Sequence, residues 1–405
     1  MQSCLELIPE DIERVYLAYS GGLDSSVLLH LLASNQDRYT LVPWHVNHGL
    51  LEAAVRMEQF CMEQAQLYGL ELRLDRLELG DIASNIEAEA RRQRYDLFAA
   101  GNDANSCIVT AHHADDQAET FLLNALRGSG SAGLRGIARS RSLGNGLLLR
   151  PLLDFSRQQL EEYASDHDLA WFNDPSNRDN RFDRNYLRNA VIPAIRRRWP
   201  KFQQALATAS RLQAETQQIL DEMAQLDFQG LCVVDEAAGP TLDVAGLLQL
   251  SNERARNLLR YWVASAGLSA IPAARLREVM SQLHAKPGSM PQIAMPDYSI
   301  RSYDQRLFLV RNDAMPECRG VFEFDLSEDI EIAEFEVKMR RADLFRRLQV
   351  DEREQRVTLR YPGSEHRPDD RHKLKRLYQK HRIPPWVRQS TAQVFLDDKL
   401  VDLLP

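Results

Sequence analysis

Cysteine and long apolar runs are scarce in this sequence. Its 405 residues include five cysteines, which are scattered along the chain without any CxxC pair. An odd, scattered set argues against a disulfide framework, a zinc knuckle or an iron–sulfur site. No apolar run reaches the ~18 residues that a membrane helix needs, so we expect no membrane partner. The acidic start MQSCLELIPEDIER lacks the basic and apolar regions of a signal peptide, so we expect a cytoplasmic protein.

An excess of positive charge is also lacking, because the formal net charge is −8 at pH 7. This sum argues against a nucleic-acid partner, but the charge is unevenly distributed. Residues 178–201 hold eight Lys and Arg against two Asp, and residues 360–388 hold nine against three acids. Such blocks can bind phosphates locally while the acidic whole keeps the chain soluble, although solvated helix faces give the same pattern.

Strand-like and helix-like segments alternate in the first third of the chain. This alternation predicts an α/β fold in which a parallel sheet carries helices on both faces. Ligands of such sheets bind at the carboxyl ends of the strands, and the polar motifs of this chain fall at those positions. The expected strands are 15–20, 41–47, 70–77 and 106–111, and the expected helices are 24–32, 52–68, 85–100 and 114–126.

The later part of the chain predicts a different organisation. Residues 128–136 are rich in Gly and Ser and are expected to form a flexible loop. A long polar helix from Trp199 to Gly230 is expected to act as a connector. We predict a catalytic domain at 1–214, a helical domain at 215–315 and a small α+β domain at 335–405. Further helices are expected at 156–167, 252–266 and 273–284, and a β-like run at 299–310.

A serine- and glycine-rich loop joins the first expected strand to the first expected helix. Its glycines let backbone amides approach an anion, and the amino end of a helix favours negative charge. The lysine of GxxxxGK(S/T) is missing, so this is not a Walker A loop. Asp24 would repel a phosphate unless Mg2+ lay between them, so Asp24 is a candidate metal ligand; a plain helix cap is the alternative. The expected phosphate-binding residues are Ser20, Gly21, Gly22, Leu23, Asp24, Ser25 and Ser26.

Further motifs follow this loop along the chain. They are HVNHGL at 45–50, NIEAEAR at 85–91, RY at 94–95, AHHADDQAET at 111–120, RGSG at 127–130, GL at 133–134, RPLLDFSR at 150–157, the run 173–200, and KLKRLYQKHRIPPWVRQS at 373–390. The loop resembles the PP-loop of the ATP pyrophosphatases, which have an adenine nucleotide alpha hydrolase-like, Rossmann-like domain. The whole series resembles the lysidine synthetases over residues 1–200 and again in the tail, whereas residues 215–330 offer little match.

The resemblance implies an ATP-dependent ligase that acts on tRNA. In that reaction the O2 oxygen of the wobble cytidine attacks the α phosphate of ATP and releases pyrophosphate. The ε-amine of free L-lysine then attacks C2, and AMP leaves. The expected cofactors are therefore ATP and Mg2+, and the expected partners are free L-lysine and tRNA(Ile) with a CAU anticodon. Whether two copies of the chain form a homodimer is left open by the sequence.

The HHADD run is the expected reaction centre. If the helix includes its first histidine, His112 and Asp116 lie four residues apart and share a face. We expect His112 to contact the phosphates or the leaving AMP, and Asp116 to bind metal or accept the proton of the amine. His113 and Asp115 are interpreted instead as a helix cap and a surface charge.

Several basic residues are candidates for RNA or phosphate binding. Arg91 and Arg94 lie three residues apart on one expected helix, and Arg184 and Arg188 lie four residues apart. Each pair can therefore hold one anion. Pairing with Glu87 or Glu89 is the alternative for the first pair. Asn85 and Glu87 are candidates to bind the α-amine of lysine, and His45 and His48 are interpreted mainly as structural. In the tail, Lys373, Lys375, Arg376, Lys380 and Arg382, together with Tyr378 and Trp386, are expected to contact tRNA.

Other functions remain as alternatives. A tRNA thiolase with the same loop generally needs a persulfide or paired cysteines; Cys61 and Cys107 are available only as single nucleophiles. An amidotransferase-type synthetase needs a glutaminase half, which the sequence does not show. A non-catalytic RNA-binding protein would not need Asp24, His112 and Asp116.

Overall fold

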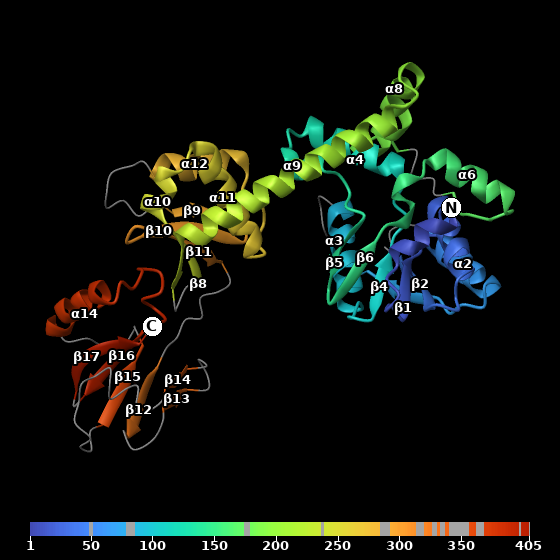
Figure 1. Cartoon of the computed structure of the whole chain (residues 1–405). Helices are drawn as coiled ribbons and strands as arrows, with labels where there is room; N and C mark the ends of the chain where they lie inside the picture. Colours follow the sequence, from blue (N-terminus) through green and yellow to red (C-terminus); the bar gives the residue numbers. More distant parts are fainter. Residues whose placement is uncertain are drawn as a thin grey trace. The chain divides into compact units, whose positions relative to one another are not determined.

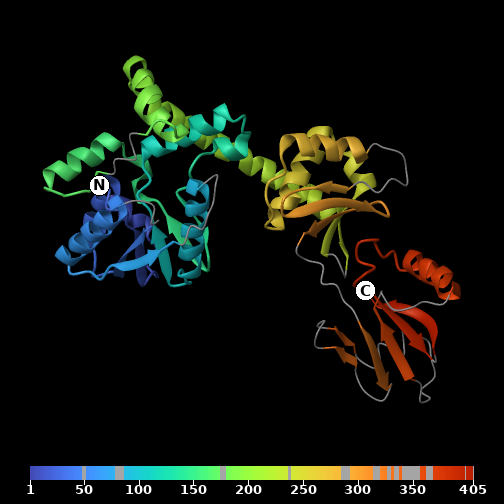
Figure 2. The same cartoon turned by 180° about the vertical axis from the view of Figure 1, so that it is seen from behind.

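The computed structural model describes residues 1–47, 52–77, 86–173, 179–235, 239–283, 292–312, 320–325, 330–332, 337–339, 356–361, 368–396 and 398–404. The chain forms two compact units, Met1–Gln218 and Ile219–Pro405, whose elements are seen from two sides in Figures 1 and 2. Within the described ranges, every helix is too short or too polar to cross a membrane.

The first unit is built on a six-stranded sheet in the order β3-β2-β1-β4-β6-β5. All neighbours pair in parallel except β5, which pairs antiparallel with β6 at one edge. The predicted parallel sheet is therefore confirmed, and the short β3 forms the other edge. The hairpin of β5 and β6 was not predicted. The strands are β1 (Arg14–Ala18), β2 (Thr40–Asn47), β3 (Arg73–Arg76), β4 (Ser106–Val109), β5 (Ser140–Leu143) and β6 (Gly146–Leu149).

Helices cover both faces of this sheet, as expected (Figure 1). Successive side chains of a strand point to opposite faces, so Val15 and Leu17 of β1 pack with one core and Tyr16 with the other. The first core includes side chains of α1, α2 and α6, and the second includes side chains of α3. Burial on both faces explains why the central strands are almost continuously apolar.

The helices of the first unit agree closely with the predicted ones. One prediction is wrong: the expected flexible loop at 128–136 contains the one-turn helix α5. The helices are α1 (Leu23–Ala33), α2 (Glu52–Leu67), α3 (Ile86–Ala100), α4 (Ala114–Leu126), α5 (Ser131–Leu134), α6 (Arg157–Asp166), α7 (Asp183–Tyr186), α8 (Ile192–Arg198) and α9 (Phe202–Leu231), with the shorter turns η1 (Gln2–Leu7) and η2 (Pro151–Asp154) and the π-helix η4 (Leu187–Val191).

The second unit begins within α9 and holds two sheets of at least four strands. The predicted helices α11 and α12 are confirmed, and they share a core with a five-stranded antiparallel sheet in the order β7-β8-β11-β10-β9. A four-stranded sheet, β12-β15-β16-β17, carries α14. The elements are β7 (Cys232–Asp235), β8 (Gly239–Asp243), α10 (Val244–Gln249), α11 (Asn252–Ser265), α12 (Ala273–Leu283), β9 (Gln292–Ala294), β10 (Tyr298–Tyr303), β11 (Arg306–Arg311), β12 (Val321–Asp325), β13 (Ile330–Ile332), β14 (Val337–Met339), β15 (Arg356–Arg360), α14 (Pro368–Lys380), β16 (Ala392–Leu396) and β17 (Lys399–Leu404).

Candidate active site

The loop after β1 is shaped by a glycine with a positive φ. Gly21 has φ +74°, which glycine adopts without strain, and it is buried against α2. A Cβ at this position would lie 2.9 Å from Cys61 Sγ, so a side chain does not fit. Gly22 follows in an extended conformation and is the N-cap of α1. The chain therefore turns sharply at the carboxyl end of β1 and enters the helix at once.

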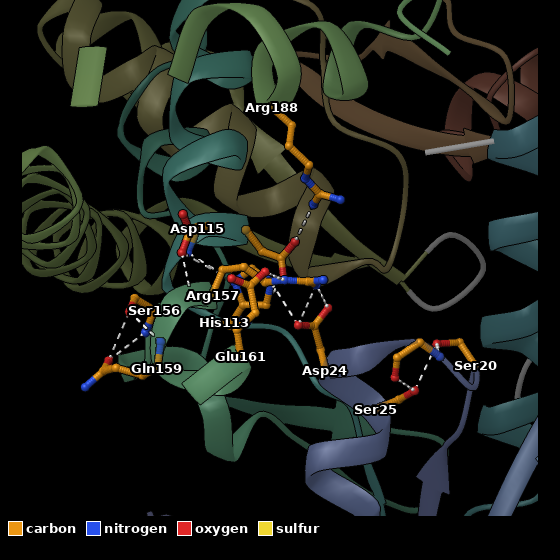
Figure 3. A network of polar contacts seen from close by, with 12 residues as sticks. Ser20, Asp24, Ser25, His113, Asp115, Ser156, Arg157, Gln159, Glu161 and Arg188 are labelled. Carbon is orange, nitrogen blue, oxygen red and sulfur yellow. Dashed lines mark hydrogen bonds and ion pairs between the residues drawn. The ribbon is translucent and has the colours of Figure 1, made fainter. Parts of the chain in front are cut away.

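Serine hydroxyls hold the loop in this shape. Ser20 Oγ lies 3.1 Å from Ser25 Oγ, and Ser25 Oγ donates to the carbonyl of Gly22 at 3.0 Å (Figure 3). The first-turn amides of a helix have no intrahelical acceptor, and the helix dipole places partial positive charge there. Such a turn can bind an anion, and the assignment of residues 20–26 to phosphate binding stays a prediction.

Asp24, in the first turn of α1, is bound by an arginine from a distant segment. Nη1 of Arg157 lies 2.8 Å from both carboxylate oxygens of Asp24 (Figure 3). Arg157 is the first residue of α6, whose N-cap Ser156 forms a capping box with Gln159. Arg157 Nε also donates to Glu161 at 3.0 Å. The capped helix therefore fixes where this guanidinium meets Asp24.

His113 joins Asp24 to the HHADD segment. Its Nε2 lies 3.6 Å from Asp24 and 3.5 Å from Asp116. The amide of Asp115 donates to Nδ1 at 3.2 Å, so the geometry assigns the imidazole proton to Nε2, which faces both carboxylates. Burial lowers the pKa of His113, but the hydrogen bond to Asp24 and the charges of Asp116, Asp24 and Asp115 outweigh burial and raise the pKa above 6.5.

The prediction of His113 as a helix cap is confirmed, because it is the N-cap of α4. The prediction that His112 and Asp116 share the first helical turn is wrong, because α4 begins at Ala114 and His112 precedes the cap. His112 instead lies just beyond β4, where its Nδ1 is 2.9 Å from Thr110 Oγ1. Burial lowers the pKa of His112 to about 3; Asp116 acts in the opposite direction, and the charges of Arg150, Arg184 and Arg91 add to the lowering.

Asp116 is held between two arginines and the cap. Its Oδ1 accepts from Arg184 at 2.8 Å and from Arg188 at 3.3 Å, and its Oδ2 accepts from the amide of His113 at 3.0 Å. Burial alone would raise the pKa of Asp116, but the charges of His113, Arg184 and His112 lower it to about 2. Asp116 is therefore a carboxylate at any physiological pH.

Arg184 and Arg188 share a second carboxylate. Nε of Arg184 donates to Glu119 at 2.8 Å, and Nε of Arg188 donates to Glu119 at 2.7 Å. Glu119 is only 1% exposed, so these two bonds compensate a fully buried charge. The π-helix η4 contains Arg188 and follows α7, which contains Arg184. These two arginines thus bind the two carboxylates of α4, Asp116 and Glu119.

The interpretation of Asp115 as a surface charge is wrong. Asp115 is 6% exposed; it accepts from the backbone amide of Arg157 at 2.8 Å and from Arg196 at 2.6 Å. Its neighbours in the sequence gave no sign of this, because both donors come from later helices. Asp115 therefore anchors the start of α6 and the end of α8 to the reaction centre.

The carboxylates around His113 supply some, but not all, of the ligands that a hard cation needs. Asp24 and Asp116 supply oxygen ligands, which Mg2+ prefers, and both approach the same imidazole nitrogen. Within the described residues, no group of three His, Cys, Asp or Glu side chains is arranged to hold a metal ion. Mg2+ typically binds through one or two carboxylates together with phosphates and waters, so this pair fits the metal when a phosphate ligand is also present.

The other predicted basic residues are spread over two elements. Arg91 and Arg94 lie on α3 with their guanidinium groups 5.2 and 5.9 Å from the centre of the Tyr95 ring. The alternative partner Glu89 binds Arg92 instead. His45 is buried and its Nδ1 lies 2.9 Å from the carbonyl of Tyr19, as a structural residue would be. His48, Asn85 and the side chain of Glu87 lie outside the described residues.

In α14 the basic residues Lys373, Lys375, Arg376 and Lys380 are exposed on one face. The prediction that Tyr378 shares this surface is wrong, because Tyr378 is buried in the core under α14. Trp386 lies beyond α14 and is half-buried, with its ring 5.4 Å from that of Phe308, edge to face. Periodicity alone did not separate the two faces of this helix.

Arg157, Asp115, Glu119 and Arg196 are the site residues that sequence reasoning missed. Arg157 is the last residue of the RPLLDFSR run, and Arg196 belongs to the basic block 178–201, so both stood in segments already singled out. Nothing in the sequence paired them with particular carboxylates, because the partners are joined only by the fold.

The fold and its anion-binding turn place the first unit in the class of PP-loop domains, and the family model described as PP-loop domain matches residues 2–195. Models described as TilS substrate binding domain and TilS substrate C-terminal domain match residues 242–308 and 356–402. A tRNA(Ile)-lysidine synthase from Serratia proteamaculans (strain 568) is 37% identical over 402 residues, covering 96% of this chain and 90% of that protein. The chain belongs to the tRNA(Ile)-lysidine synthase family.

Further comparisons agree with this membership. The tRNA(Ile)-lysidine synthase from Edwardsiella ictaluri (strain 93-146) is 34% identical over 404 residues, covering 96% of this chain and 90% of that protein. Among solved structures, the U34-tRNA thiolase NcsA from Methanococcus maripaludis has a TM-score of 0.45 and 16% identity, over 53% of this chain and 77% of that chain. That likeness is too low to bear on function.

Proposed function

We propose that this protein uses ATP to join free L-lysine to C2 of the wobble cytidine of tRNA(Ile) with a CAU anticodon. In the first step O2 of the cytosine bonds to the α phosphorus of ATP, and pyrophosphate leaves. In the second step the lysine ε-amine bonds to C2, the C2–O2 bond breaks with release of AMP, and the amine loses a proton. The products are lysidine, AMP and pyrophosphate.

The observation that carries this proposal is the meeting of the phosphate loop and the HHADD segment at His113. Its Nε2 lies within 3.6 Å of Asp24, which follows the loop, and within 3.5 Å of Asp116. Phosphate binding and a second reactive group are thereby brought to one point, as a reaction between ATP and another substrate requires. The names of the relatives supply the identity of the tRNA and the amino acid.

The proposed roles follow from the contacts. Residues 20–26 bind the ATP phosphates through backbone amides and hydroxyls. Arg184 and Arg188 place two positive charges beside Asp116, where charge builds up as pyrophosphate and then AMP leave. We propose Asp24, His112 and Asp116 as catalytic residues. Because the pKa of His112 is lowered to about 3, it acts as a neutral hydrogen-bonding group, not as an imidazolium.

Asp24 and Asp116 are the residues that would hold Mg2+ together with the ATP phosphates. The bound ion would neutralise phosphate charge and polarise the α phosphorus. Asp24 forms an ion pair with Arg157, and Asp116 forms one with Arg184. Arg157 orders the carboxylate of Asp24, and the charges of His113 and Arg184 help to lower the pKa of Asp116.

For tRNA binding we propose the exposed face of α14, with Lys373, Lys375, Arg376 and Lys380, together with Arg91, Arg94, Arg184 and Arg188. Exposed lysines and arginines mostly contact phosphates and position the RNA. We also propose the division into a catalytic domain at 1–214, a substrate domain at 215–315 and a tRNA-binding domain at 335–405.

A thiolase is disfavoured by the state of the described cysteines. Burial raises the pKa of Cys61 and of Cys107 to about 12, so neither is a thiolate at neutral pH. Both side chains are fully buried in the core of the first unit.

The test is incorporation of radiolabelled L-lysine into bulk bacterial tRNA by the purified full chain, with and without ATP. We expect label that depends on ATP and appears with equal amounts of AMP and pyrophosphate. Label without AMP, or AMP formation that needs a sulfur donor in place of lysine, would reject the proposal. Transcripts of tRNA(Ile) with a CAU anticodon and with the wobble cytidine replaced by uridine then identify the acceptor base.

A further inference from the structure

Three arginines surround one tyrosine beside the reaction centre. Tyr95 of α3 has Arg91 at 5.2 Å and Arg141 of β5 at 5.3 Å from its ring centre. Arg150, the residue after β6, adds a third charge: burial alone would raise the pKa of Tyr95, but the charges of Arg91, Arg150 and Arg94 lower it below 10. We call Arg91, Arg141 and Arg150 the arginine cluster.

The arginine cluster lacks compensating carboxylates within the described part of the chain. Both described acids of α3, Glu89 and Asp96, are bound by Arg92 on another face of that helix. The described residues supply no ion pair for Arg91, Arg141 or Arg150. Burial lowers the pKa of Arg150, and the charges of Arg141 and Arg91 add to this effect, whereas the interaction with Tyr95 acts in the opposite direction. Like charges held together in this way favour an anion, and the described residues do not supply one.

Arg150 has the least access to water of the three. It is only 5% exposed, and although Nη1 donates to the carbonyl of Ala138 at 2.5 Å, its Nε is buried without a hydrogen-bond partner among the described residues. A buried donor that lacks an acceptor costs free energy of roughly 1–3 kcal/mol. An oxyanion seated at the arginine cluster would supply that acceptor.

The position of the arginine cluster follows the order of the strands. β1, β4 and β6 are neighbours and parallel, so their carboxyl ends form one edge of the sheet. The phosphate loop follows β1, His112 follows β4, and Arg150 follows β6. The arginine cluster therefore lies beyond His112 as seen from the phosphate loop, and the charges of Arg150 and Arg91 contribute to the low pKa of His112. The strand β4 thus lies between the strand that leads to the phosphate loop and the strand that leads to Arg150.

We propose that Arg91, Arg141 and Arg150 form a second oxyanion site, which binds one of the two substrates other than ATP. This inference rests on the proposed function, in which two substrates besides ATP carry oxyanions. The α-carboxylate of the free amino acid is one source, and the phosphodiester next to the reacting cytidine is the other. Arginine binds both by paired N–H···O hydrogen bonds.

The test uses ligand binding without turnover. The full chain is saturated with α,β-methylene ATP, which occupies the phosphate loop but cannot be cleaved between its α and β phosphates. Binding of L-lysine and of L-lysinamide is measured by calorimetry, and binding of bulk tRNA by filter retention over a range of salt. The variants are Arg91→Gln and Arg141→Gln, both at exposed positions, with Arg92→Gln on the same helix as the matched control.

We expect each cluster variant to weaken one ligand about tenfold, while Arg92→Gln binds as the wild type does. The site binds the α-carboxylate if the cluster variants bind L-lysine more weakly but bind tRNA as the wild type does. In that case the wild type should also bind L-lysinamide, which lacks the carboxylate, as weakly as the variants bind L-lysine. Weaker tRNA with a salt slope lower by about one assigns it to the phosphodiester. Lysine and tRNA binding that match Arg92→Gln in both cluster variants would overturn the proposal.

A further readout separates this inference from the proposed function. If the wild type binds neither L-lysine nor tRNA, the proposed function fails, but the oxyanion site is still tested by inorganic phosphate. In the presence of α,β-methylene ATP, phosphate should raise the melting temperature of the wild type and of Arg92→Gln more than that of Arg91→Gln and Arg141→Gln. Equal increases in all four proteins would refute the oxyanion site.

Discussion

Arg157 Nη1 lies 2.8 Å from each carboxylate oxygen of Asp24, although 133 residues separate the two in the chain. This contact joins the first turn of α1, where the phosphate loop ends, to the first residue of α6. Both side chains are partly exposed, with 37% of Arg157 and 27% of Asp24 accessible to solvent. A ligand at the loop can therefore reach both groups.

Replacement of Arg157 by Gln should weaken ATP binding about tenfold, because Asp24 would then face the phosphates without a compensating charge. Arg157→Lys keeps the charge but not the two-oxygen contact, and should recover part of the affinity. Calorimetric titration with ATP and Mg2+ measures both. Arg211→Gln, which removes an exposed i,i+4 partner of Glu215, is the control. An unchanged dissociation constant for Arg157→Gln would show that Asp24 needs no partner.

Replacement of Gly21 by Ala should lower both stability and ATP affinity. The change combines a φ of +74° with a Cβ 2.9 Å from Cys61 Sγ, so the free energy of unfolding should fall by about 2–3 kcal/mol. Gly69→Ala is a matched control, since Gly69 has φ +67° and a Cβ there would meet nothing within 4 Å. Its free energy of unfolding should fall by only about 1 kcal/mol. Urea unfolding compares the two, and equal losses would exclude the clash with Cys61.

His112 should make the protein less stable as the pH falls below 6.5. Its pKa is lowered to about 3 in the folded chain from 6.5, so between these values the unfolded chain binds the proton and the folded chain does not. The stability contribution of neutral His112 is complete above pH 6.5 and declines steadily toward pH 3. Urea unfolding of His112→Gln should show a weaker decline than the wild type between pH 6.5 and 4.5. Parallel curves would mean that His112 titrates normally.

Replacement of Asp115 by Asn should destabilise the protein by about 1–3 kcal/mol, since one oxygen becomes an amide donor that faces either Arg196 or the amide of Arg157. Asp183→Asn serves as the control, because Asp183 pairs with Arg127 at the surface and should change stability by less than about 0.5 kcal/mol. Chemical unfolding measures both variants. If both variants lose a similarly small amount of unfolding free energy, Asp115 behaves as a surface charge.

Replacement of Asp116 by Asn should reduce lysine transfer by roughly 100-fold or more, because the carboxylate between Arg184 and His113 is lost while its shape is kept. The folded state is followed by circular dichroism and the melting temperature, so that loss of fold is not mistaken for loss of chemistry. Asp96→Asn on the surface of α3 is the control. Near-normal transfer by a folded Asp116→Asn variant would remove Asp116 from the mechanism.

The sequence by itself determined the parallel sheet, its helices and the phosphate loop. These features depend on residues close together in the chain: apolar runs such as VYLA, the glycines before Asp24, and the alternation of strands and helices. Local rules also placed His113 as the cap of α4, because a cap is decided by the residues of its own turn.

Only the tertiary structure decided which charges meet. Asp115 looked like a solvated side chain in the sequence, but α6 and α8 fold over it and supply its donors. His112 was assigned to a helical turn, but the helix is capped at the next residue, so His112 lies in the segment between β4 and α4, where the charge of Arg150 acts on it. Such pairings depend on strand order and on where distant helices begin, and those are set by the packing of the whole core and not by any local spacing.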